Sequence, residues 1–203
     1  MILPIRTLAI PALLALAACA QAPDAPPPLT EGTWSVDPAG SSLSYVTIKA
    51  GEIAEANSFT GLSGSVSPEG AARIEIDLST VETKVDIRNE RMRDLFFEVA
   101  NHPTASITAQ IDPAAFGALE VGESTVQPLA AVLDLKGVEA PLEADVRVTR
   151  TAENRVIATT IEPVILDAGA LELTDKLAQL QEIAGLPSIS PAVPVTFSIA
   201  FQR

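Results

Sequence analysis

The sequence predicts an all-β protein: an antiparallel barrel of about eight strands with one or two short helices. Two observations carry this prediction. Apolar and polar residues alternate with a period of two in many successive segments, which is typical of half-buried antiparallel strands. The alternating faces hold mainly Ala, Val, Leu and Ile, since the chain has only six Phe, one Trp and one Tyr. A closed barrel leaves no free strand edge, although a two-sheet sandwich would show a similar pattern.

Nine segments show this alternation, which predicts eight or nine strands. In chain order they are 33–37, 42–48, 59–66, 72–78, 104–111, 129–135, 142–148, 155–161 and 193–201. Gly137 and Pro141 lie between two of these segments and indicate a hairpin connection. Eight strands enclose a space that side chains fill or that holds one small ligand.

Two segments interrupt the alternation. Residues 86–98 are dense in charge and suit a helical turn or a loop. Residues 173–185 carry Leu173, Leu177, Leu180 and Ala184 at helical spacing, which predicts a short amphipathic helix that serves as a lid or end plug. Thr174 is the expected N-cap, and Gly185 followed by Pro187 is the expected end.

The first 31 residues predict export and a membrane anchor. Arg6 precedes an uncharged, mostly apolar run at 7–18, as in a secretory signal, and the run is too short to span a membrane. The run ends in Leu16-Ala17-Ala18-Cys19, which resembles the lipobox of bacterial lipoproteins. That resemblance implies a signal peptide at 1–18, a lipidated Cys19, a Pro-rich tether at 19–31 and a barrel domain at 32–203. An ordinary signal peptide with an incidental cysteine is the alternative.

This anchor places the protein in the cell envelope, on the periplasmic face of a membrane. Ala20 follows the cysteine, where an aspartate in such lipoproteins signals retention in the inner membrane. The outer membrane is therefore favoured if the bacterium is Gram-negative. Acyl chains contribute about 0.8 kcal/mol per buried CH₂, so several chains on one cysteine make a durable anchor.

Composition excludes several classes of function. The formal charge is −13, and removing residues 1–18 with Arg6 leaves −14, so nucleic acid is not an expected partner. His102 is the only histidine, which excludes zinc sites built on three histidines. No phosphate-binding glycine loop opens a helix. We therefore expect no metal site and a protein that is not an enzyme.

Several motifs, in this order, resemble the YceI-like family. They are WSVDPAGSSLSYVTIK at the start of the body, FTGLSGSV, IEIDLSTVETKVDIRNERMRDLFFE, NHPTASIT and LDLKGVEAPLEADV. The resemblance implies a lipocalin-like barrel, in which some family members hold a polyisoprenoid chain. Three positions depart from the family pattern: Gly40 replaces a histidine, and Asn89 and Arg91 replace an acid and a histidine.

The resemblance implies that the ligand is an apolar lipid chain, that no cofactor is expected apart from such a bound isoprenoid or quinone, and that the ligand-binding residues are inward-facing positions of the barrel. They are Leu43, Tyr45, Ile74, Ile76, Leu78, Ile107 and Ala131. The charged segment from Arg88 to Asp94, with Lys49, is either a salt-bridged surface loop or a polar gate at the barrel mouth. The alternative function is a structural or interaction protein of the envelope, whose barrel would be filled by Leu129, Leu133, Phe197 and Phe201.

Overall fold

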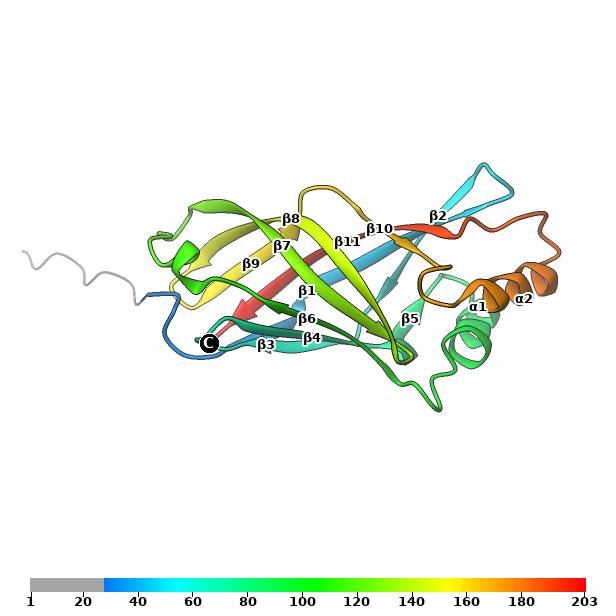
Figure 1. The fold of residues 1–203 in the computed structure, drawn as a ribbon, viewed down its shortest axis with the longest axis horizontal. Coiled ribbons are helices and arrows are strands. Elements are labelled where there is room, and N and C mark those ends of the chain that lie inside the picture. Colours follow the sequence, from blue (N-terminus) through cyan, green and yellow to red (C-terminus); the bar gives the residue numbers. More distant parts are fainter. Residues whose placement is uncertain (1–27) are drawn as a thin grey trace, which may run out of the picture.

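The computed structural model describes residues 28–203 and shows a closed antiparallel barrel with its two α-helices at one end (Figure 1). The predicted signal peptide, Cys19 and most of the predicted tether lie outside the described residues. The strands are β1 (Trp34–Lys49), β2 (Ile53–Phe59), β3 (Leu62–Val66), β4 (Ala71–Asp77), β5 (Val81–Glu82), β6 (Thr104–Gln110), β7 (Ser124–Leu135), β8 (Val138–Ala152), β9 (Arg155–Thr160), β10 (Val164–Asp167) and β11 (Ala192–Gln202). The helices are η1 (Leu78–Thr80), α1 (Asp86–Arg91), η2 (Met92–Phe97), η3 (Pro113–Phe116) and α2 (Thr174–Ala184).

Eight strands form the barrel, in the order β1-β3-β4-β6-β7-β8-β9-β11, and β11 pairs with β1 to close it. Both halves of β1 pair with β11, from Ser35↔Gln202 to Tyr45↔Val195. The remaining strands extend this sheet, since β2 and β5 follow β1 and β10 follows β11. The predicted barrel is thus confirmed, and the sandwich alternative is wrong.

The first two predicted segments form one long strand because a bulge joins them. The register between β1 and β11 shifts between Asp37 and Ser42, and Ala200 N donates a 2.9 Å hydrogen bond to Ser41 Oγ there. Gly40 lies in the bulge, where a Cβ atom would stand 2.1 Å from Arg155 Nη2. A glycine at this position therefore leaves room for the 2.7 Å ion pair between Arg155 Nη1 and Asp37 Oδ2.

The sequence pattern did not predict β2, and the reason is chemical. Phe59, Asn57 and Glu55 lie opposite Leu43, Tyr45 and Thr47 of β1. Asn57 is buried on this face, where a simple pattern requires an apolar residue. Its Nδ2 donates to Thr47 Oγ1 at 3.2 Å, so part of the amide is satisfied by the neighbouring strand.

The helices close one end of the barrel over an aromatic cluster. Tyr45 stacks on Phe59 with ring centroids 5.5 Å apart, and Phe97 contacts Phe59 and Phe96 edge-on at 5.6 and 5.0 Å. Leu177 and Leu180 of α2 pack against this core, as the amphipathic pattern predicted. Burial among these aromatic rings raises the pKa of Tyr45 well above its usual value. We call this part of the molecule the closed end.

Helix α2 differs from its prediction at the N-terminus. Thr174 is its first helical residue, and Leu173 is the N-cap and makes no side-chain capping bond. Leu173 is buried instead, so packing at the closed end determines where the helix begins. The predicted end at Gly185 is confirmed, since Gly185 is the C-cap with a φ of 62°.

Glu98, at the end of η2, binds a lysine in the turn between β7 and β8 and a lysine of α2. Because both contacts need an ionised carboxylate, we expect the protein to lose stability in acid. The Glu98 carboxylate bonds Lys136 and lies 3.0 Å from Lys176 Nζ of α2. The hydrogen bonds from Lys136 and then Lys176 lower the pKa of Glu98 from 4.5 to about 2. Because the pKa of Glu98 is lower in the folded than in the unfolded state, the ionised carboxylate stabilises the fold at pH values above 4.5. This stabilisation is lost as the pH falls from 4.5 toward 2.

Glu98→Gln is therefore expected to unfold at a lower urea concentration than the wild type at pH 7, with the difference vanishing near pH 2. Urea unfolding followed by circular dichroism between pH 2 and 7 measures this. Glu139→Gln, an exposed change on β8 beside the same turn, is the control. A difference between wild type and Glu98→Gln that stays constant over the whole pH range would contradict the assignment.

Candidate ligand cavity

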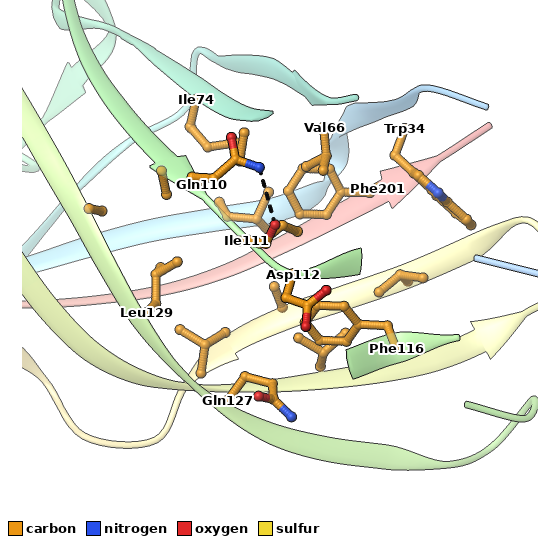
Figure 2. Close-up of a pocket in the computed structure, with 18 of the residues that line it drawn as sticks. Trp34, Val66, Ile74, Gln110, Ile111, Asp112, Phe116, Gln127, Leu129 and Phe201 are labelled. Carbon is orange, nitrogen blue, oxygen red and sulfur yellow. Dashed lines mark hydrogen bonds between the residues drawn. The ribbon is translucent and has the colours of Figure 1, made fainter. Parts of the chain in front are cut away.

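A cavity of about 320 Å³ occupies the half of the barrel away from α1 and α2, and Figure 2 shows it in close-up. Inward-facing residues of β1, β4, β6, β7, β8, β9 and β11 line it, and most of them are aliphatic or aromatic. The side chains labelled in Figure 2 include Ile74, Leu129, Phe116, Trp34 and Phe201. An apolar cavity of this kind favours an apolar ligand and gives it few polar partners.

Four of the seven predicted lining residues border this cavity, and three do not. Leu43, Ile74, Ile107 and Ala131 line it. Tyr45, Ile76 and Leu78 lie instead in the packed core toward the closed end, and Leu78 is only 2% exposed. Alternation identifies the inward face of each strand, but it does not reveal how deep along the strand the packed core begins.

The residues expected to fill a packed barrel do not fill it. Leu129, Phe197 and Phe201 border the cavity, while Leu133 belongs to the packed core. The lumen of this chain is therefore packed over one half of its length and hollow over the other.

The cavity opens where β6 and β7 separate. Ser106–Ala109 of β6 pair with Asp134–Ala131 of β7, and the pairing ends there. Beyond this point both strand ends line the cavity, with Gln110 and Ile111 on one side and Gln127–Ala130 on the other. Pro128 has no N–H to donate, so it suits a strand with an unpaired edge toward β6. We call this opening, together with the adjoining end of the barrel, the mouth.

Residues 28–31, at the end of the predicted tether, pack against the mouth. Leu29 is buried, lines the cavity and accepts a 2.8 Å hydrogen bond from Trp34 Nε1 through its carbonyl oxygen. Arg203 Nη1 donates to Pro28 O at 2.9 Å, and the Arg203 guanidinium lies 4.7 Å from the centre of the Trp34 ring. The sequence offered one signal for this contact: Leu29 is a single apolar residue between a proline run and polar residues.

The charged segment lies at the closed end and not at the mouth. Arg88 of α1 donates from Nη1 to Glu55 Oε2 at 2.7 Å, and Lys49 bonds the same carboxylate oxygen. The hydrogen bond from Lys49 is the largest cause of the lowered pKa of Glu55. Asn89 is buried and accepts a 2.8 Å hydrogen bond from Thr83 N, so it supports the local backbone. The segment is therefore not a polar gate at the mouth, and its Arg88, together with Lys49, forms a salt-bridged cluster on Glu55.

Two further properties of residues 28–203 bear on function. Within this part of the chain, no group of three or more His, Cys, Asp or Glu side chains is placed to hold a metal ion. No helix in the same range is long and apolar enough to span a bilayer.

A closed eight-stranded antiparallel barrel with an open apolar cavity defines a lipocalin-like barrel. The chain belongs to the YceI-like family, whose domain model matches residues 34–201. It is similar to a polyisoprenoid-binding domain from Saccharophagus degradans implicated in plant cell wall breakdown, with 35% identity and a TM-score of 0.81. That similarity covers 83% of this chain and 97% of the other.

A second solved structure is similar in fold. The Burkholderia cenocepacia protein BcnA has 16% identity and a TM-score of 0.61, over 81% of this chain and 98% of its own. Comparison with curated proteins found no match. The family and the fold, together with the apolar character of the cavity, are the basis for a functional proposal.

Proposed function

We propose that this protein binds the apolar chain of an isoprenoid, a quinone or a similar lipid in its cavity, for storage or transport, without catalysing a reaction. The observation that carries the proposal is the apolar cavity of about 320 Å³, which opens at the mouth. The Saccharophagus degradans domain, named as polyisoprenoid-binding, supports the same class of ligand.

The energetics of such binding need no strong polar contact. Burying ten methylene groups gives a gross gain of about 8 kcal/mol. Ordering the chain and losing its free motion offset a large part of this gain. The net affinity is then sufficient for a carrier that must also release its ligand.

Mass spectrometry of organic extracts from protein purified without detergent tests this proposal. We expect one apolar lipid per protein, and we expect the delipidated protein to take up a fluorescent prenyl lipid. Extracts without lipid from several preparations, together with no uptake of the prenyl lipid, would show that the cavity has another role.

We further propose that Cys19 is lipidated and holds the barrel on the periplasmic face of a membrane. The lipobox-like sequence before Cys19 and the proline-rich segment after it support this. Because the chain enters the barrel at Leu29 beside the mouth, a membrane anchor at Cys19 would keep the mouth close to lipid.

Replacing Cys19 by Ser is expected to release the protein from the membrane. The acyl chains that make the anchor durable cannot be attached to serine by this route. Fractionation of bacterial cells that express both forms measures the change, with more than ten-fold redistribution to the soluble fraction expected. An ordinary signal peptide predicts the opposite, namely equal distribution of both forms.

A further inference from the structure

We infer that the cavity selects a lipid whose polar end is uncharged, such as a prenol or a quinone, over the same chain carrying a phosphate or pyrophosphate. This inference deepens the proposed function and rests on it. It follows from the charges around the mouth, where the polar end of a bound chain would lie.

The cavity wall offers an anion no positive partner. Among the described residues that line it, the single ionisable one is Asp112, which is acidic and lies at the mouth (Figure 2). The amide nitrogens of the two lining glutamines have partners already: Gln110 Nε2 donates to Glu69 O at 2.7 Å, and Gln127 Nε2 donates to Thr125 Oγ1 at 3.4 Å.

The rim of the mouth adds further negative charge. Glu31 and Glu69 are exposed and follow Thr30 and Pro68, which line the cavity. Glu120 is exposed and follows Leu119, which packs with Leu29 and Trp34. Each of these carboxylates is one residue along the chain from a residue at the mouth, so together with Asp112 they make this end of the barrel negatively charged.

Three arginines near the mouth are engaged in structural contacts, whereas Arg73 and Arg147 alternate with lining residues and therefore face the outside of the barrel. Arg203 bonds the carbonyl oxygens of Pro28 and Glu31 and lies over Trp34. Arg150 is 2% exposed and donates to Leu119 O at 3.1 Å and to Glu153 O at 3.0 Å. Arg155 pairs with Asp37 at 2.7 Å. To bind a phosphate, one of them would have to leave these partners.

An anion at the mouth therefore meets two unfavourable effects. It loses water on entering an apolar site without a counter-charge, which costs several kcal/mol if burial is complete. If it stays outside, it lies among carboxylates within a Debye length of about 8 Å at physiological salt. An uncharged hydroxyl or carbonyl avoids both effects and can accept or donate a hydrogen bond.

Farnesol and farnesyl pyrophosphate test this inference, because they share one chain and differ only in the polar end. We expect the delipidated protein to bind farnesol at least ten-fold more tightly at low salt, as measured by displacement of a fluorescent prenyl lipid. The difference between the affinities for farnesol and farnesyl pyrophosphate should decrease in high salt, because salt screens the carboxylates.

A variant that lacks two carboxylates at the mouth, together with a matched control, tests whether these charges cause the difference in affinity. Glu69→Gln with Glu120→Gln should strengthen pyrophosphate binding and leave farnesol binding unchanged, because neither side chain lines the cavity. Glu139→Gln at the closed end removes one charge far from the mouth and should change neither. Equal or tighter binding of the pyrophosphate overturns the inference and leaves the proposed function standing. Binding of neither compound overturns both.

Discussion

Ala144→Trp is expected to weaken lipid binding by about a thousand-fold while the barrel still folds. Ala144 lies on β8 opposite Leu129 of β7, is half-buried and lines the cavity. An indole here occupies a large part of the cavity of about 320 Å³. Excluding about five chain carbons, at about 0.8 kcal/mol each, removes about 4 kcal/mol of binding free energy.

The measurement is titration of the delipidated variant with a fluorescent prenyl lipid, beside its thermal unfolding. Ala71→Trp is the matched control, since Ala71 is exposed on β4 and does not line the cavity. The control should bind as the wild type does. If Ala144→Trp kept full affinity while folding normally, the lipid would have to bind elsewhere.

The barrel could be predicted from the sequence because the alternation of apolar and polar residues along each strand is a local pattern. Ile74 and Ile107 were assigned to the inward face from period-two alternation alone, and they are paired neighbours in the barrel wall. The family resemblance added a topology that alternation cannot supply. The same alternation missed β2, because Asn57 and Glu55 occupy positions where the pattern requires apolar residues.

The position of the cavity could not be predicted, because it depends on contacts between distant segments. Tyr45 and Leu43 are two residues apart on one face of β1, yet only Leu43 lines the cavity. The boundary between them forms where Tyr45 stacks on Phe59, and Phe59 in turn contacts Phe97 from η2. Similarly, the role of Leu29 depends on Trp34 and Arg203, which lies at the opposite end of the chain.

These contacts divide the barrel into a closed end that stabilises the fold and a mouth at which the proposed ligand would enter. The larger apolar cluster, with Phe97 and Leu173, lies toward the helices. The smaller cluster, which contains Leu29 and Trp34, lies at the mouth, and Phe116 packs against it. The two clusters share no buried residue, although Phe201 packs against both. A substitution in the larger cluster should therefore affect mainly stability, and a substitution at the mouth should affect mainly binding.

Phe97→Ala is therefore expected to lower the free energy of unfolding by about 3–5 kcal/mol, the cost of a Phe-to-Ala change in a core. Phe97 is 6% exposed and contacts two other aromatic rings. It does not line the cavity, so the folded fraction should bind lipid with unchanged affinity. Urea unfolding measures the stability, and titration below the unfolding transition measures the affinity.

Phe116→Ala is the matched comparison, because it makes the same chemical change at the mouth. Phe116 is half-buried and lines the cavity, so its loss should cost about 1–2 kcal/mol of stability, less than full burial of a Phe is worth. Its loss should also weaken lipid binding by about ten-fold, because one apolar wall of the site is removed. Equal losses of affinity in both variants would mean that the closed end and the mouth act as one unit. The opposite pattern, with stability lost at Phe97 and affinity lost at Phe116, follows only if packing and ligand binding are carried by different halves of the same barrel.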